Sequence, residues 1–403
     1  MNNDKPNFFS SVAKYNHERF HSEVISWCFN FNKEFAKNFI KKITGIELDK
    51  TPDQIAKSEE NSIDIILNFE HSNQNYSIFI ENKVKATEHI INIKNKKNII
   101  ESEEIILLRK NKMFELSQTE FYYTQNKKER FHYFVYLKPC IIDENSDNAP
   151  EYVETKEYNN WCNLSNLNIE NPWKTIAYFE LAECMKPVLN NNEAEAIIYN
   201  SYYQFISNEK YFPTNALKIQ DLSFTEINNE PNDLEENFKT KYINYEYFKI
   251  LSHKLKEMFS KIPKDILTHE VKSDSSNSSE PMLIISKKIK TPDEIKPYFE
   301  KTAFNEFLSI GIQLQGNSLK FFIEAFDYKN ATIKKDKKKD FSDFCHVKIT
   351  KHLPLEMRNN KKTYSKGKTF NTLSEVIELE SIADTTKSIF SKIEFYIKSI
   401  VAL

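Results

Sequence analysis

Glycine is rare in this chain, and its rarity excludes the phosphate-binding loops that depend on it. Only 4 of the 403 residues are glycine. Neither the Gly-rich dinucleotide fingerprint nor the Gly-Lys-Ser/Thr phosphate loop occurs, and both need glycine where the backbone approaches a phosphate closely. We therefore expect no nucleotide cofactor.

Paired cysteines and long apolar runs are also lacking. The five cysteines are scattered without the paired spacing of a zinc ribbon, which suits a reducing compartment. No apolar run approaches the roughly 20 residues that span a membrane, and the first residues, MNNDKPNFFSSV, are too polar for a secretory leader. The sequence therefore predicts a cytoplasmic protein without a membrane segment.

The residues that are present describe an ordinary folded protein. Hydrophobic residues make up 40% and charged residues 28% of the chain, a balance typical of globular proteins. The formal net charge of −2 means that attraction to nucleic acid must come from local patches. The length suggests two or three domains, and a change of character near residue 212 divides the chain into 1–212 and 213–403.

The first part, 1–212, mixes helical and strand-like patterns, which predicts an α/β (α+β) core. Apolar residues recur at helical spacing over 16–43, 86–116, 171–189 and 192–206. Strands are expected at 63–69, 76–84 and 130–139, with a first strand only weakly marked before them.

The second part, 213–403, is expected to be a C-terminal α+β region. Its patterns predict a long helix over 232–262, a hairpin turning at Gly316-Asn317 and a final helix over 374–401. We expect this region to serve substrate selection, dimerisation or partner docking.

Charged residues stand at the ends of the two strongest strands, where buried strands should carry none. If 63–69 and 76–84 pair as an antiparallel hairpin, Asp64 lies opposite Glu81, and opposed Cβ atoms are about 4.5–5.5 Å apart. Lys83 follows Glu81 by two residues, so strand alternation places it on the same face. Two carboxylates and one amine would therefore converge on one point.

This convergence fits a metal site. Like charges so close repel each other, and burying them is costly without a cation. Oxygen ligands with room for water suit Mg²⁺ or Mn²⁺, and the lysine could help deprotonate a metal-bound water or stabilise charge on a phosphate. The alternative is an ordinary set of solvated strand ends, because charged residues are common throughout the chain.

The motifs resemble the PD-(D/E)xK nuclease superfamily, in particular its bacterial branch with a Glu-x-x-His-Ser first helix and a Glu-Asn-Lys strand. The similar stretches are ERFHSEVISW, SIDIIL, IFIENKVKATEHIINI, HYFVYLKP and WKTIAYFELAECMKPVL. They cover roughly the first half of the chain. The proline expected near Asp64 is absent, and the glutamine usual in the helix after the lysine appears as Asn92.

The resemblance implies a restriction-endonuclease-like αβββαβ core with helical additions, and Mg²⁺-dependent hydrolysis of nucleic-acid phosphodiester bonds by a DNA endonuclease. It implies Asp64, Glu81 and the backbone carbonyl of Asn82 as metal ligands and Lys83 as the catalytic lysine. Glu18 would reach the same site from the first helix as a catalytic residue and metal ligand. The auxiliary candidates are His21, Asn92 and Tyr178.

Several lysines could guide DNA toward this site. Lys85, Lys94, Lys96 and Lys97 would give one edge a positive potential toward phosphates, although such a run is also typical of a solvated surface. The resemblance further suggests antiviral defence in bacteria, with a homodimer or a dedicated defence partner protein. The competing hypothesis is a catalytically inactive nucleic-acid-binding or protein-interaction module on the same scaffold.

Overall fold

The chain forms two compact units: Met1–Ile219 with Ile227–Tyr242, and Gln220–Glu226 with Ile243–Leu403. The division was expected after residue 212, but residues 213–219 belong to the first unit. The Leu217 N–H donates to the Ile141 carbonyl at 2.8 Å and joins this segment to that unit. The computed structural model describes Phe9 and residues 18–60, 63–83, 90–94, 96, 99–126, 131–142, 163–189, 193–219, 222–225, 239–240, 242–244, 246–248, 250–251, 254, 270–274, 282–299, 307–315, 317–325, 333–351, 363–366, 370–376, 379 and 381–401.

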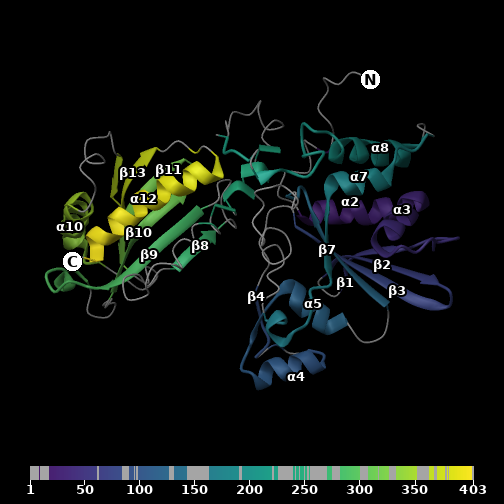
Figure 1. Ribbon diagram of the computed structural model, residues 1–403, viewed down its shortest axis with the longest axis horizontal. Helices are drawn as coiled ribbons and strands as arrows, with labels where there is room; N and C mark the ends of the chain where they lie inside the picture. Colours follow the sequence, from purple (N-terminus) through teal and green to yellow (C-terminus); the bar gives the residue numbers. More distant parts are fainter. Residues whose placement is uncertain are drawn as a thin grey trace. The chain divides into compact units, whose positions relative to one another are not determined.

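The first unit is built on a mixed five-stranded sheet with the order β1-β2-β3-β6-β7 (Figure 1). β1, β2 and β3 are antiparallel neighbours, whereas β6 is parallel to β3 and β7 is parallel to β6. Parallel neighbours need a crossover connection, and β4, α4, β5 and α5 lie in the connection between β3 and β6. The bounds are β1 Ala56–Glu60, β2 Ile63–His71, β3 Gln74–Asn82, β4 Ile90–Asn92, α4 Glu103–Lys110, β5 Glu115–Ser117, α5 Gln118–Asn126, β6 Phe131–Lys138 and β7 Trp173–Ala177.

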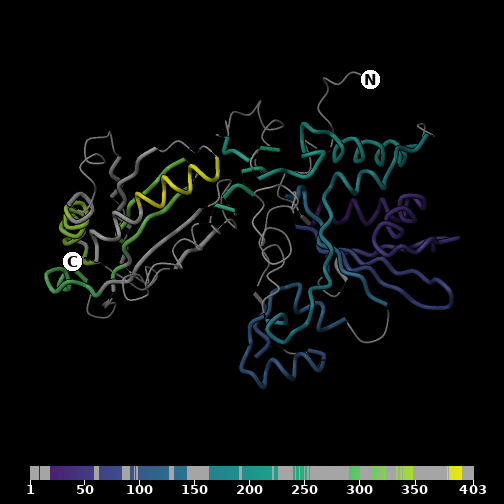
Figure 2. Tube along the Cα trace, in the orientation of Figure 1, coloured from purple at the N-terminus to yellow at the C-terminus, as the bar shows by residue number. Residues whose placement is uncertain are grey.

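Helices cover one face of this sheet, and the crossover covers the other (Figure 1). The two faces have separate cores: in β6, Val135 and Leu137 belong to the helix-covered core, and Phe134 and Tyr136 belong to the crossover core. α3 and α7 lie side by side although they are far apart in the sequence (Figure 2). The covering helices are α2 Glu18–Phe31, α3 Lys33–Thr44, α7 Tyr178–Met185 and α8 Ala194–Ile206, and a 3₁₀ turn spans Ser165–Leu167.

The predicted hairpin register is confirmed. Ile65 pairs with Ile80, and the pairing continues to His71 opposite Gln74. The connecting residues, Ser72 and Asn73, both have positive φ, 52° and 59°, as two-residue hairpin turns of type I′ require. The strand at 131–138, the α8 helix and the weakly marked first strand, β1, are also present.

Three of the expected helices were wrong in extent. The helix over 16–43 breaks at Asn32, whose side chain accepts hydrogen bonds from the N–H groups of Glu34 and Phe35 and so begins α3. Within 86–116 the only described helix is α4, and β4 pairs with β5 instead. Within 171–189 the residues of β7 pair with β6, and the helix begins at Tyr178. A cap or a strand partner therefore overrides the helical period in each case.

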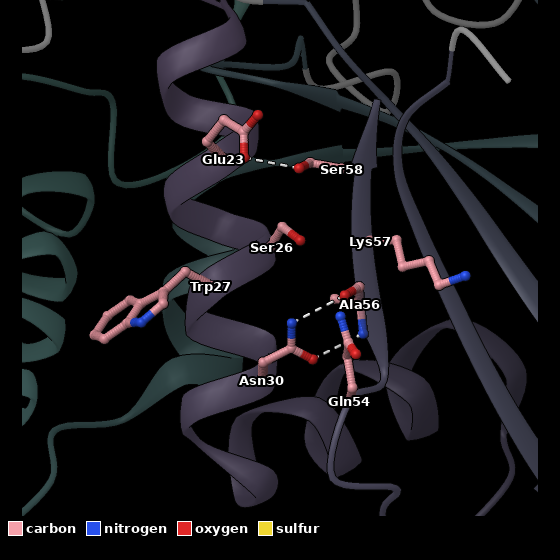
Figure 3. A pocket seen from close by; sticks show the side chains of 8 residues that line it. All are labelled: Glu23, Ser26, Trp27, Asn30, Gln54, Ala56, Lys57 and Ser58. Carbon is pink, nitrogen blue, oxygen red and sulfur yellow. Dashed lines mark hydrogen bonds between the residues drawn. The ribbon is translucent and has the colours of Figure 1, made fainter. Parts of the chain in front are cut away.

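The outer edge of the sheet, β1, is fastened to α2 by Asn30 (Figure 3). Its Oδ1 accepts hydrogen bonds from the N–H groups of Ile55 and Ala56 at 2.8 and 2.9 Å, and its Nδ2 donates to the Ala56 carbonyl at 2.9 Å. One amide thereby occupies backbone groups that an edge strand would otherwise offer to another chain.

The second unit contains a six-stranded sheet in which all neighbours are antiparallel, with the order β12-β13-β11-β10-β9-β8. Gln315 pairs with Ser318, so the hairpin predicted around Gly316-Asn317 is confirmed. The final helix begins at Ile382, because 374–376 belong to β13. The bounds are β8 Glu270–Asp274, β9 Met282–Lys290, β10 Phe307–Gln315, β11 Ser318–Ala325, α10 Lys338–Lys351, β12 Thr363–Lys366, β13 Phe370–Val376 and α12 Ile382–Val401, with 3₁₀ turns at Lys296–Tyr298 and Lys335–Lys337.

Two further expectations concern helices. Most of 232–262 lies outside the described residues, and the described residues from 239 to 254 are helical. Among the helices that the structure describes, none has the length and apolar character needed to cross a membrane.

Replacing Asn30 by Ala should lower the free energy of unfolding of the first unit by about 2–3 kcal/mol. Two backbone groups of Ala56 in β1 and the N–H of Ile55 just before it would lose their partner at part-buried positions, and each such loss costs about 1 kcal/mol or more. Asn30→Asp keeps the acceptor and should lose less. Urea denaturation followed by tryptophan fluorescence measures both, with the exposed Lys50→Met as control. Equal stability of wild type and Asn30→Ala would contradict this anchoring role.

Candidate functional site

Asp64, Glu81 and Lys83 lie on the crossover-covered face of the sheet. In β3, Phe79 packs in the crossover core, and strand side chains alternate, so Glu81 and Lys83 share its face. In β2, Ile66 packs in the same core. Asp64 precedes Ile66 by two residues, so it lies on the same face. The structure therefore brings together the two acids and the lysine that the sequence pattern singles out.

Short contacts tie these charged groups together. Lys83 Nζ lies 2.7 Å from Glu81 Oε1, and the backbone N–H of Asn82 donates to Asp64 Oδ2 at 2.8 Å. Glu81 is fully buried and Lys83 is 6% exposed, whereas Asp64 is only partly buried. The site thus has a deep ion pair and a second carboxylate at its more accessible side.

The side chain of Asn82 points to the opposite, helix-covered face. Its Nδ2 donates to Ser22 Oγ on α2 at 3.1 Å, and its Oδ1 accepts from the Tyr178 hydroxyl on α7 at 3.0 Å. All three side chains are buried. Because neighbouring side chains of a strand point to opposite faces, fixing Asn82 here holds Glu81 and Lys83 on the crossover side.

His21 also lies on the helix-covered face. Its Nδ1 and the Tyr202 hydroxyl are 3.1 Å apart in a buried hydrogen bond, and its ring stacks on Phe205 with centroids 6.0 Å apart. The two auxiliary candidates His21 and Tyr178 are therefore separated from Glu81 by the sheet. They position Asn82 and its surroundings, and do not line the acidic site.

The start of α5 adds two residues to the site that the sequence pattern did not reveal, Gln118 and Tyr122. Gln118 Nε2 donates to the Tyr122 hydroxyl at 2.7 Å. Burial raises the pKa of Tyr122 far above its usual range, and the nearby charges of Glu81 and Asp64 raise it further, whereas the Gln118 hydrogen bond and Lys83 oppose the rise. Tyr122 also packs in the crossover core with Phe79 and Ile66, so its side chain lies on the same side of the sheet as the three charged groups.

α5 is held at this place by a buried carboxylate, Glu120. Its Oε2 accepts the Ser117 N–H at 3.0 Å, and its Oε1 accepts the Leu164 N–H at 2.9 Å. These bonds fix the first turn of α5 to the segment before β7. In the sequence, Gln118 and Tyr122 are marked only by their four-residue spacing, which puts them on one helix face.

The oxygen atoms of this site fit a hard divalent cation such as Mg²⁺ or Mn²⁺. Asp64 and Glu81 supply carboxylates. The N–H and C=O of one strand residue point to the same side of the strand, so the Asn82 carbonyl points toward β2, as does its N–H, which donates to Asp64. Gln118 Oε1 is a buried acceptor without a hydrogen-bond partner among the described residues, and a water on the metal could donate to it.

The fit rests on two carboxylates and a carbonyl. Within the described part of the chain, no three His, Cys, Asp or Glu side chains gather as a metal site. Glu18 begins α2, but its side chain lies outside the described ones, so its expected role as a third acid stays a prediction.

The remaining expected residues lie in the crossover. Asn92 stands in β4, with its exposed side chain accepting the Lys94 N–H at 3.0 Å, and is not on a helix beside the lysine. Lys94 and Lys96 are exposed and lie over the rings of Phe114 and Phe121, at 5.5 and 4.0 Å. Lys85 and Lys97 lie outside the described residues.

An open polar groove lies elsewhere in the first unit, between α2 and β1 (Figure 3). It has a volume of about 590 Å³. Glu23 and Ser58 are joined across it by a 2.7 Å hydrogen bond. None of the charged residues of the site lines it.

Tyr178→Phe and Ser22→Ala should each lower the free energy of unfolding by about 1–2 kcal/mol, because each leaves part of the buried Asn82 amide without its partner. Their effects should not add, since both act through one amide. A double-mutant cycle in urea measures the coupling, and Tyr178→Phe combined with Asn30→Ala serves as an additive control. Strict additivity of Tyr178→Phe with Ser22→Ala would show that Asn82 is not held as described.

Comparison of the chain with protein-family models, with curated proteins and with solved structures gives no match. The resemblance to the PD-(D/E)xK superfamily therefore stays a prediction that rests on the sequence motifs.

Proposed function

We propose that the first unit is a metal-dependent DNA endonuclease. One observation carries the proposal: Asp64 and the buried Glu81–Lys83 pair converge on one face of the sheet, with the Asn82 backbone between them. An acidic pair can hold the cation that assists phosphodiester hydrolysis, and an adjacent lysine can stabilise the negative charge that develops.

The order of elements supports a restriction-endonuclease-like core. α2 and α3 are followed by the antiparallel strands β1, β2 and β3, a crossover containing α5, and the parallel strands β6 and β7. This succession agrees with the αβββαβ pattern that the resemblance implies. The site lies where β3 ends, beside the crossover.

The residues of the site have separable roles in this proposal. Asp64, Glu81 and the Asn82 carbonyl would hold the cation, which when bound lowers the pKa of water and stabilises charge on the phosphate. Lys83, in contact with Glu81, would hold the attacking water by a hydrogen bond and stabilise the charge that develops on it. Gln118 and Tyr122 would orient that water by hydrogen bonds.

Asp64→Asn and Lys83→Met should each slow Mg²⁺-dependent nicking of supercoiled plasmid DNA by about 100-fold or more, the usual effect of losing a charge-stabilising group or a metal ligand. Asp64→Asn keeps an acceptor for the Asn82 N–H, so it removes charge with little change of structure. Nicking is measured by agarose gel with Mg²⁺ and with EDTA.

The matched control is Lys50→Met, which removes an exposed lysine and should nick like wild type. Nicking by Lys83→Met at the wild-type rate would overturn the catalytic assignment. Binding of DNA by wild type without cleavage in Mg²⁺ or Mn²⁺ would favour the competing hypothesis of an inactive nucleic-acid-binding module.

A further inference from the structure

A second lysine, Lys138, ends the strand next to the site. In the parallel pairing of β3 and β6, Glu81 lies beside Tyr136 and Asn82 beside Leu137. The Lys83 N–H donates to the Leu137 carbonyl at 2.9 Å, so the pairing continues past Asn82. The next position on β6 is Lys138, which puts the two lysines on neighbouring strands, about 4.8 Å apart in the direction of the hydrogen bonds.

Lys138 belongs to the same face of the sheet as Glu81 and Lys83. Tyr136 packs in the crossover core, and Lys138 follows it by two residues, which strand alternation places on the same face. Pro139 comes next and restricts Lys138 to an extended backbone, so the alternation holds to the end of the strand. On the neighbouring strand β7, the residue paired with Lys138 is the small Ala177.

Lys138 is only 4% exposed, which is unusual because lysine is almost never buried unless it is paired. The register and the shared face place this second lysine on the strand next to Lys83, on the side of the sheet that carries the acidic pair. Among these four groups, the charges of Asp64 and Glu81 cancel those of Lys83 and Lys138. A divalent cation would then leave an excess of two positive charges, or of one where Glu18 also joins the site.

That excess matches the reaction. A phosphodiester carries one negative charge, and attack by hydroxide adds another, so the pentavalent state is a dianion. Groups placed where this charge develops stabilise the transition state more than the ground state. Lys83 contacts Glu81 and is assigned to the attacking water. A second lysine could therefore stabilise the charge on the phosphate beside the metal ion.

We infer that Lys138 is a phosphate-binding catalytic residue of this site, donating to a non-bridging oxygen of the scissile phosphodiester of DNA. This inference rests on the proposed function. It extends that function by giving the two lysines different roles: Lys138 on β6 contacts the substrate, and Lys83 contacts the attacking water.

The test compares Lys138→Met, Lys138→Arg and Lys50→Met with wild type. Binding of a short duplex DNA is measured by fluorescence anisotropy in Ca²⁺ at several salt concentrations, and nicking is measured in Mg²⁺. Lys138→Met should reduce the slope of log K against log salt by about 1, the loss of one phosphate contact. Nicking should fall about 100-fold or more.

Lys138→Arg keeps the charge and should restore most of the salt slope, and Lys50→Met should leave both quantities unchanged. A merely structural role would lower the melting temperature without changing the salt slope of the folded protein. An unchanged slope and rate in Lys138→Met, with wild type active, would overturn the role of Lys138 and leave the proposed function standing. Absence of DNA binding and nicking in wild type would overturn both.

Discussion

The site depends on the placement of one strand residue, Asn82. Its amide is held on the helix-covered face by Ser22 and Tyr178, and its backbone N–H holds the Asp64 carboxylate. Strand alternation then commits Glu81 and Lys83 to the other face. A slip of β3 by one residue would turn the amide toward apolar crossover side chains and both charges into the helix-covered core. Such a slip is strongly disfavoured, because every side chain would change faces.

The sequence was sufficient for those features that follow from a period of two residues. The hairpin register follows from alternation, although the strands were expected to end at 69 and begin at 76 and in fact continue to His71 and from Gln74. The same alternation brings Asp64 and Glu81 to one face. Neither feature needs knowledge of the rest of the chain. The apolar runs on both sides of the charges made the strands easy to recognise, because a sheet covered on both faces has few polar positions.

The features that the sequence did not reveal come from distant parts of the chain. A helical period over 86–116 suggested one helix after Lys83 and gave Asn92 an auxiliary role. The β4–β5 pairing uses part of that segment, and the helix beside the site is therefore α5, with Gln118 and Tyr122. Tyr122 also packs in the crossover core. From the sequence it could not be distinguished from an ordinary core aromatic residue.

The buried Glu81–Lys83 pair is difficult to explain as a source of stability. Removing ionised groups from water costs several kcal/mol each, and replacing a buried ion pair by apolar side chains of similar volume is often neutral or stabilising by about 1–4 kcal/mol. The carboxylate of Asp64 adds a like charge nearby and increases the cost of keeping Glu81 ionised. The adjoining strand residues Ile80 and Phe79 are apolar and buried, so Leu or Met would suit this position better if packing were its only role. The same argument applies to Lys138 at the end of the next strand. The proposed binding of a cation and of a phosphate would give these buried charges a role that packing does not.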